Sequence, residues 1–375
     1  MDFSLTDEQQ AIQKLFRDFA DKEIRPVAAD LDQNPRFPKE LFMKVGELGF
    51  FRMRYPAEDG DASAIADRIT YILAVEELAR GSLAVAVVCT MQSLMGTYFL
   101  HRHADAALRE RLFEPAMRGE LIGTICMTEP NAGSDLLSLA TRADEKDGRW
   151  LLSGQKTWIT SAPVADFFTV LARTGEKELS IFLVERGAHG LEVGRAIHKM
   201  GVRASLTSEV AFDQTPATCM LGERGVGLGS LLEILAEIRV MTAALAIGVA
   251  QAAYEDSLQY SKERVQFGKP ICKFQAIQQH IADMRTQLEA ARRMTQWATW
   301  RSDQGMENAT EAAMAKLFAS EAATAVCDKA ARVMASYGYA TDYPVERYLR
   351  DVRFTLIGGG TSEILKTNIA RSLTR

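Results

Sequence analysis

The sequence lacks the features that mark membrane, secreted or nucleic-acid-binding proteins. Its five cysteines are scattered, form no CxxC pair and are odd in number, which argues against a disulfide framework. A net charge of −5 provides no basic surface for nucleic acid. The N-terminus carries acids where a signal peptide needs positive charge, and the longest apolar run, SLAVAVVCTM, is too short to cross a bilayer. We expect a cytoplasmic protein without membrane insertion, nucleic-acid partner or metal site.

Three regions of different texture divide the 375 residues, which exceed what one compact core usually holds. Residues 1–120 show helical periodicity, beginning with an N-cap at Thr6. Residues 121–222 contain short segments rich in β-branched and aromatic residues, separated by turn signals, which predict a sheet. Residues 223–375 return to long helical patterns, and the first of these is apolar on more than one face. The predicted order is therefore α, then β, then α.

Three stretches are candidates for binding a planar or phosphorylated ligand. The turn CMTEPNAGSD (126–135) offers backbone and hydroxyl donors, although a capped surface loop explains it equally well. Trp158, in GQKTWIT, could stack on a planar ligand, although a tryptophan in a strand usually belongs to the core. In KERVQFGKP, Arg264 could face a pyrophosphate, although a solvated helix end is commoner.

Taken together with YGYATDYPVERYLRD, these stretches have the order and spacing seen in the acyl-CoA dehydrogenase flavoproteins, and the resemblance runs from LTDEQ to IAR. It implies an α+β fold with an N-terminal α-helical domain (1–120), a central β-barrel-like or sandwich domain (121–222) and a C-terminal four-helix bundle (223–375). It also implies non-covalently bound FAD and a homotetramer in which a neighbouring subunit completes each flavin site. An acyl-CoA is the implied substrate, and an electron-transfer flavoprotein or a similar acceptor is the implied partner.

The resemblance assigns roles to individual residues. The isoalloxazine ring should lie against Met127, Thr128, Trp158 and Thr160, and Ser134 should approach the flavin or the CoA. The FAD of the adjacent subunit should be reached by Arg264, Gln266 and Phe267. Where the family commonly has a glutamine and a Gly-Gly pair, this chain has Arg332, Ala335 and Ser336, of which Arg332 could still serve a phosphate. The flavin should also be approached by Thr361 and Glu363, and the substrate by Met91, Arg239 and Gly358.

The catalytic base of the family is missing from both of its usual positions. The family's reaction removes an α-proton while the β-hydrogen leaves as hydride, which requires a general base. Most members carry a glutamate at the position of Gly359, and branched-chain and long-chain members carry one at the position of Ile238. The backbone N–H of Gly359 would still polarise the thioester carbonyl.

Glu237 is the candidate substitute base, because it neighbours Ile238. Adjacent helical positions point about 100° apart, so Glu237 could serve only after a local bend or a one-residue shift in register. The alternative is that Glu233 and Glu237, one turn apart, form a solvated or salt-bridged edge.

The loss of side chains at Gly358 and Gly359 opens volume beside Cα and Cβ, which suits a branched, cyclic or otherwise bulky acyl group. The run LAVAVVCTMQSL contains no arginine to pair with a second carboxylate, which favours a neutral acyl group. The leading hypothesis is FAD-dependent α,β-dehydrogenation with a non-standard or missing base. The alternatives are elimination, desulfination or enoyl-CoA reduction on the same fold, and a non-catalytic acyl-CoA-binding homologue.

Overall fold

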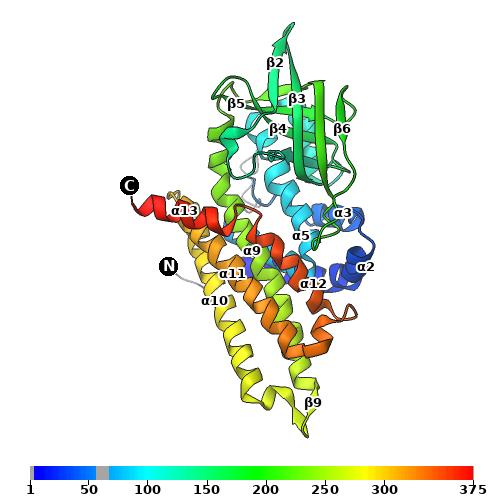
Figure 1. The fold of residues 1–375 in the computed structure, drawn as a ribbon, viewed down its shortest axis with the longest axis vertical. Coiled ribbons are helices and arrows are strands. Elements are labelled where there is room, and N and C mark those ends of the chain that lie inside the picture. The colour runs from blue at the N-terminus through cyan, green and yellow to red at the C-terminus, as the bar shows by residue number, and fades with distance from the viewer. Residues whose placement is uncertain (1–3, 56–66, 375) are drawn as a thin grey trace.

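The computed structural model describes residues 4–55 and 67–374, which form three regions (Figure 1). The sheet occupies one end of the molecule, the N-terminal helices lie beside its middle, and the long C-terminal helices extend to the opposite end. This is the predicted α, β, α order. The single long helix α9 (Gly227–Glu263) runs from the sheet to the far end, so it connects the regions physically as well as in sequence.

The N-terminal region begins at the predicted cap. The Gln9 N–H donates to the Thr6 hydroxyl (3.2 Å), and the Gln9 side chain accepts from the Thr6 N–H (3.1 Å). This reciprocal capping box confirms the helix start. The helices of this region are α1 (Asp7–Phe19), η1 (Ala20–Ile24), η2 (Arg25–Val27), α2 (Ala28–Gln33), α3 (Lys39–Glu47), α4 (Arg68–Gly81), α5 (Leu83–Thr90), η3 (Met91–Gly96), α6 (Tyr98–His103), α7 (Ala106–Leu108), η4 (Arg109–Phe113) and α8 (Glu114–Met117).

The apolar run SLAVAVVCTM, expected to be too short for a bilayer, belongs to a longer helical run in the structure. α5, the π-helical η3 and α6 join into one helical run, Leu83–His103, of 21 residues, which is long and apolar enough to span a membrane by composition. The protein itself buries 89% of the most apolar window of this run. The run is therefore a core helix of the N-terminal region.

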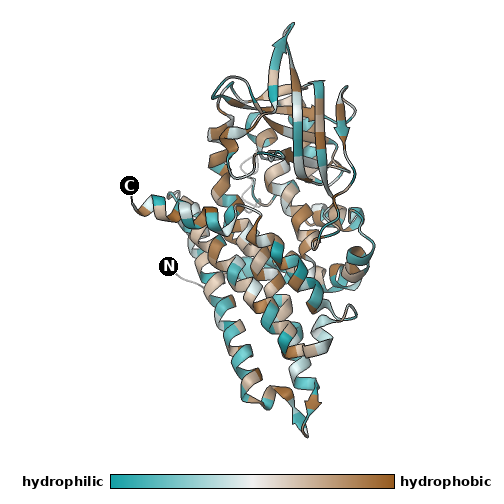
Figure 2. Cartoon of the chain, in the orientation of Figure 1, coloured by the Kyte–Doolittle hydropathy of each residue, from teal (hydrophilic) through white to brown (hydrophobic). Residues whose placement is uncertain are grey.

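The central region forms an eight-stranded sheet in the order β6-β7-β3-β2-β4-β5-β8, with β1 parallel to β4. β4 and β5 are each buried along six successive residues, so they form the core of the region. Brown and teal residues alternate along the outer strands in Figure 2, as expected for strands with one solvated face. The strands are β1 (Gly123–Cys126), β2 (Arg142–Lys146), β3 (Arg149–Thr160), β4 (Phe167–Arg173), β5 (Leu179–Glu185), β6 (Leu191–Val193), β7 (Thr207–Pro216) and β8 (Cys219–Leu221), with the turn η5 (Leu136–Ser138).

The C-terminal region packs its long helices around α9. Residues 238–250 of α9 are buried on every face, which confirms the pattern predicted for this helix. α4 approaches so closely that a Cβ on Gly248 would lie 2.2 Å from the Glu76 carbonyl oxygen. The remaining elements are β9 (Val265–Gln266), β10 (Lys269–Pro270), η6 (Ile271–Lys273), α10 (Gln275–Asp303), α11 (Ala309–Met334), η7 (Ala335–Tyr339), α12 (Pro344–Asp351), η8 (Val352–Leu356) and α13 (Ser362–Leu373).

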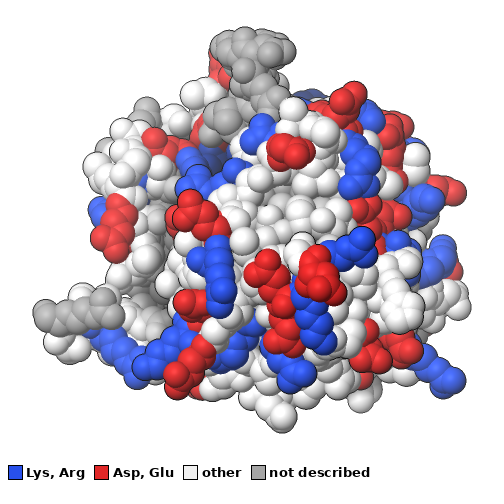
Figure 3. Space-filling view, turned by 90° about the horizontal axis from the view of Figure 1, so that it is seen from above, with Lys and Arg blue, Asp and Glu red and all other residues white. Residues whose placement is uncertain are grey.

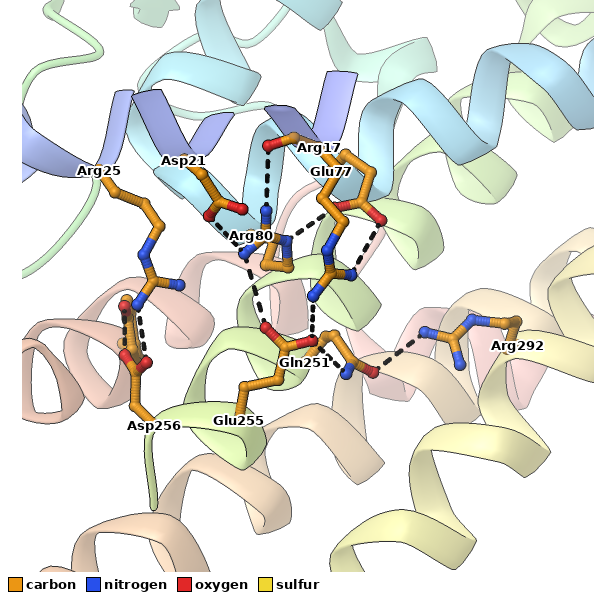
Figure 4. Close-up of polar contacts among 10 residues, drawn as sticks. Arg17, Asp21, Arg25, Glu77, Arg80, Gln251, Glu255, Asp256 and Arg292 are labelled. Carbon is orange, nitrogen blue, oxygen red and sulfur yellow. Dashed lines mark hydrogen bonds and ion pairs between the residues drawn. The ribbon is translucent and has the colours of Figure 1, made fainter. Parts of the chain in front are cut away.

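A buried ionic network ties the N-terminal helices to the bundle (Figure 4). Arg80 is 2% exposed, and its guanidinium lies 2.7 Å from Glu77 and 2.9 Å from Asp21. Glu255 of α9 pairs with both Arg80 (3.5 Å) and Arg17 (2.8 Å). Because every cation here faces a carboxylate, the desolvation of these charges is compensated. On the outer surface, the face in Figure 3 shows charges of both signs interspersed.

Candidate active site

The polar loop after β1 is fixed to β3 by a buried ion pair. Lys156 is fully buried, and its Nζ lies 2.8 Å from Glu129 Oε1 and 3.0 Å from the Met127 carbonyl oxygen. Glu129 also accepts from the backbone N–H groups of Ala140 (2.6 Å) and Thr141 (2.9 Å). Burial alone would raise the pKa of Glu129, but these hydrogen bonds outweigh it and lower the pKa. The loop therefore has one fixed path beside the strand.

Trp158 faces outward although it lies within β3. The register of β3 against β7 shifts between Lys156 and Ile159, and Trp158 has a φ of 60°. A bulge of this kind re-aims a side chain, and a positive φ is costly for a bulky residue. The result is a Trp158 side chain that is 57% exposed. Such strain at an exposed aromatic residue indicates a binding surface.

The residues predicted for the isoalloxazine ring lie near one another. The Thr157 N–H donates to the Thr128 carbonyl (2.8 Å), which places the loop against the bulge. The Thr124 hydroxyl donates to the Thr160 carbonyl (2.6 Å), which joins the end of β3 to β1. These contacts, with the bond to the Met127 carbonyl, bring together Met127, Thr128, Trp158 and Thr160.

Arg264, Gln266 and Phe267 lie at the end of the molecule opposite the sheet that contains Trp158. They belong to the β9–β10 hairpin at the tip of the bundle in Figure 1, and Figure 2 shows apolar residues there. Phe267 is 93% exposed and has a φ of 50°. The Arg264 guanidinium lies 5.8 Å from the Tyr337 ring. Within one chain, this set does not meet the Trp158 neighbourhood.

The other predicted flavin residues are spread along the chain. Arg332 and Ser336 are exposed at the end of α11 and the turn after it. Ser134 is exposed on the loop after β1. Thr361 is the N-cap of α13, and Glu363 is exposed in its first turn.

The glycine run bends back onto α9. Gly359 has a φ of 71°, and a Cβ placed on it would lie 2.9 Å from Thr242 Oγ1 and 3.7 Å from Ile238 Cγ2. Positions 359 and 238, at which the resemblance leads us to expect a carboxylate, are therefore neighbours in the structure. Within the described chain the Gly359 N–H forms no hydrogen bond, so it is free to donate to a ligand.

The predicted acyl-pocket residues are less open than the sequence suggested. A Cβ on Gly358 would lie 2.9 Å from Phe354 Cζ, so the Phe354 ring already fills the space beside this glycine. Met91 is buried and begins η3, the π-helical segment. π-helical turns inside helices are frequent at functional sites. At Gly359 the atom 2.9 Å from the Cβ position is instead the Thr242 hydroxyl oxygen, so Gly358 has an aromatic neighbour and Gly359 a polar one.

Two buried cations adjoin the glycine run. Lys316 is fully buried, and its Nζ donates to the Gly360 carbonyl (2.6 Å). Burial lowers the pKa of Lys316 to about 8 against the attraction of Glu321, and the charge of Arg239 adds to the lowering. Arg239 is 7% exposed, and its guanidinium donates weakly to the Ala309 carbonyl (3.4 Å) while its Nε has no partner. Neither cation forms an ion pair with any residue that the structure describes.

Glu237 is held away from this space by ion pairs. Its carboxylate pairs with Arg54 and, at 3.5 Å, with Arg68, both from the N-terminal region. Glu233, one turn earlier, pairs with Arg102 (3.4 Å). These contacts favour the alternative in which Glu233 and Glu237 form a salt-bridged edge over the one in which Glu237 is a substitute base. The geometric reason is that neighbouring positions on a helix, such as 237 and 238, point in different directions.

Sequence reasoning missed several residues that shape the site. Glu129 and Lys156 lie inside the motifs already singled out, and a lysine among apolar strand positions was the available signal. Lys316 and Thr242 gave no such signal, because their neighbours become known only when α9, α11 and the glycine run are packed.

Comparison with known protein families shows the class to which this chain belongs. The N-terminal, middle and C-terminal domain models of acyl-CoA dehydrogenase match residues 6–120, 124–215 and 225–374. The chain belongs to the acyl-CoA dehydrogenase family, whose members are FAD-dependent oxidoreductases that act on CH–CH bonds.

Individual relatives narrow the comparison. The chain is 58% identical over 377 residues to benzylmalonyl-CoA dehydrogenase of Aromatoleum aromaticum, with 100% of both chains covered. It is similar to the structure of butyryl-CoA dehydrogenase from Megasphaera elsdenii, with a TM-score of 0.95, 36% identity and 100% of both chains covered. A structure described as an FAD complex of PigA is 29% identical, with a TM-score of 0.94 over 100% of this chain and 99% of that one.

Proposed function

We propose that this protein oxidises the Cα–Cβ bond of an acyl-CoA that carries a carboxylate on Cα, and that CO2 leaves Cα in place of a proton. The observation that carries the proposal is the absence of a carboxylate at both 359 and 238, two neighbouring positions, while the Gly359 N–H forms no hydrogen bond within the described residues. The relative that is 58% identical is described by a substrate of this class, since benzylmalonyl-CoA carries its second carboxylate on Cα.

A carboxylate on Cα removes the need for a general base. When the bond from Cα to the carboxylate breaks, its electron pair enters the thioester enolate, and loss of hydride from Cβ then completes the double bond. Benzylmalonyl-CoA would thus give CO2, cinnamoyl-CoA and one hydride equivalent, with no proton released. FAD, when bound, supplies the hydride acceptor. The N–H of Gly359 would stabilise the charge on the thioester oxygen.

The residues present fit a flavin. Trp158 offers an exposed indole face on a strained bulge, and the buried Lys156–Glu129 pair fixes the adjoining loop. Met127, Thr128 and Thr160 would hold the ring there, as the resemblance implies. Arg239 would lie near the thioester end of the substrate.

The proposal revises the expectation of a neutral acyl group. That expectation considered a second carboxylate only at the far end of the chain, against LAVAVVCTMQSL, where no arginine is present. A carboxylate on Cα would instead lie at the glycine run. The expected bulk remains, because a benzyl group is a large substituent.

We also propose a homotetramer and an electron-transfer flavoprotein or similar acceptor. The support for an oligomer is that Trp158 lies in the sheet and Phe267 at the far tip of the bundle, so both could meet one flavin only across subunits. Arg264, Gln266, Arg332 and Ser336 would then serve the flavin of the neighbouring subunit. Sedimentation of the purified protein tests the tetramer.

The function is tested by anaerobic addition of two matched thioesters to the FAD-bound protein. Benzylmalonyl-CoA should bleach the flavin, and 3-phenylpropanoyl-CoA, which has the same skeleton without the carboxylate, should bind without bleaching it. Bleaching by 3-phenylpropanoyl-CoA at a comparable rate would show that a base exists and would refute the proposal. CO2 release without bleaching would identify a non-oxidative decarboxylase.

A further inference from the structure

Polar side chains of α9 lie beside Gly359, the position at which the family commonly has a glutamate. Thr242 Oγ1 lies 2.9 Å from the Cβ position of residue 359, and Ile238 closes the space at 3.7 Å. Arg239 precedes Thr242 by three residues, so the two share a face of α9. The Arg239 Nε is buried and has no partner.

The opposite side of the glycine run is bordered by a second cation. Lys316 Nζ donates to the Gly360 carbonyl at 2.6 Å, which places the ammonium beside the residue after Gly359. Lys316 lies seven residues after Ala309 on α11, so both lie on the face of α11 that Arg239 contacts. Arg239 and Lys316 are close enough to repel one another.

Two buried cations that form no ion pair with the described residues are unfavourable unless a ligand brings an anion, and Glu321 and Glu363 attract Lys316 without pairing with it. Burial of an unpaired charge costs several kcal/mol as a general rule, and proteins normally pair such groups. Elsewhere in the described chain, the buried Lys156 and Arg80 each face a carboxylate. The space at Gly359 is where the family places a carboxylate of its own, and this chain has none there.

We propose that the α-carboxylate of the substrate occupies the space left by the side chain at Gly359, and that Arg239 and Lys316 select for its charge. This inference rests on the proposed function. For Cα to lose CO2, the bond that breaks must stand perpendicular to the plane of the thioester carbonyl, so that its electrons enter the enolate. A carboxylate directed into the space at Gly359 is separated from the thioester oxygen, which the Gly359 N–H would bind.

The test uses a ligand that carries the carboxylate but cannot be oxidised. Malonyl-CoA has no Cβ–H bond that could be lost as hydride, and acetyl-CoA is its counterpart without the carboxylate. Calorimetric titration of the FAD-bound protein should show malonyl-CoA binding about 10-fold to 100-fold more tightly than acetyl-CoA, as charge-assisted hydrogen bonds would provide. Arg239→Met and Lys316→Met should each reduce this preference several-fold, and Arg239→Lys should retain part of it. Lys329→Met, a change on the same helix at a lysine paired with Asp283, should leave it intact.

A second pair of variants tests the space itself. Gly359→Ala should weaken malonyl-CoA more than acetyl-CoA, because its methyl group would enter the site beside Thr242. Gly305→Ala is the matched control: Gly305 also has a positive φ, 68°, against 71° at Gly359, but it lies outside the site and its methyl group would meet nothing within 4 Å. Its preference for malonyl-CoA should match that of the wild type.

The outcomes separate this inference from the function on which it rests. If benzylmalonyl-CoA bleaches the flavin but malonyl-CoA binds no better than acetyl-CoA, the carboxylate site is refuted and the function stands. A preference that survives both Arg239→Met and Lys316→Met also refutes it. Equal weakening of both ligands would show a purely structural role, again against the inference. If the preference and its loss are observed but no thioester bleaches the flavin, the site stands and the oxidative function fails.

Discussion

Two lysines in this protein are completely buried, and their surroundings differ. Lys156, in the sheet, lies 2.8 Å from Glu129, which also accepts two backbone hydrogen bonds. Lys316, in the bundle, donates to a carbonyl oxygen and forms no ion pair within the described residues. Burial lowers the pKa of both. The charge of Lys156 is therefore paired with a carboxylate inside the fold. The charge of Lys316, beside the glycine run, is not paired with one.

The difference between the two lysines distinguishes a charge that stabilises the fold from a charge that a ligand could neutralise. A charge that only stabilises the fold is compensated by the fold, as at Lys156. A charge that remains uncompensated beside a space where a side chain is missing points to a ligand that supplies the opposite charge. This contrast is the reason for the proposal that the substrate supplies the carboxylate that the glycines at 358–360 lack.

The largest expected effect on activity comes from adding a carboxylate beside the glycine run, near Lys316. Ile238→Glu places one beside Gly359, at a helical position where no backbone strain arises. We expect dehydrogenation of 3-phenylpropanoyl-CoA to rise about 10²-fold to 10⁴-fold, the usual contribution of a general base. Flavin bleaching measures it, and Ile238→Gln is the control without a base. Equal rates in the two variants would show that position 238 does not reach Cα.

The buried ion pair between Lys156 and Glu129 is tested by removing the lysine. Lys156→Met leaves Glu129 buried without its partner, so the free energy of unfolding should fall by about 3–5 kcal/mol. Urea denaturation measures this loss. The double variant Lys156→Met/Glu129→Gln should recover much of it, because no unpaired charge remains. A loss below about 1 kcal/mol for Lys156→Met would remove the contrast between the two lysines.

The second lysine should instead give a pH-dependent effect on stability. Its pKa is about 8 in the folded protein against an ordinary value of 10.5, so the unfolded chain binds more protons between these pH values. The contribution of Lys316 to stability should therefore rise with pH across this window, by on the order of 2 kcal/mol. Arg239, Glu321 and Glu363 are the charged groups that act on it.

Denaturation of the wild type and Lys316→Met from pH 7.5 to 10.5 tests this expectation. A methionine side chain cannot titrate, so the stability advantage of Lys316→Met should be largest at low pH and shrink toward pH 10.5. A constant difference between the two proteins would show that Lys316 titrates normally and is not an uncompensated charge.

The smallest effect is expected at Glu237. Because its carboxylate is engaged by Arg54 and Arg68, Glu237→Gln should leave kcat on benzylmalonyl-CoA within about twofold of the wild type. Steady-state kinetics measure it. A fall of a hundredfold or more, with intact FAD content, would restore Glu237 as the base.

Much of the architecture could be predicted because it follows local rules. Residue spacing along a helix predicts the capping box at Thr6 and the burial of α9. It also predicts that the side chains of Glu237 and Ile238 point in different directions. The outward position of Trp158 could not be read from alternation, since a bulge reverses it. The length of the 83–103 run was misjudged because a π-helical segment continues a helix through polar residues.

The polar surroundings of the glycines depend on packing between distant segments. Thr242, Lys316 and Gly359 are separated by up to 117 positions in sequence, and their approach becomes visible only when α9, α11 and the glycine run are placed together. The absence of a carboxylate at positions 238 and 359 could be read from the sequence, whereas the position of the buried Lys316 beside the glycine run could not.

The most direct measurement of the central claim is the ratio of CO2 released to flavin reduced in one anaerobic turnover with benzylmalonyl-CoA. We expect a ratio of about one, with cinnamoyl-CoA as the product and no reduction by 3-phenylpropanoyl-CoA, because the departing carboxylate provides the electron pair that a base would otherwise release. Flavin reduction without CO2, with the carboxylate retained in the product, would contradict it.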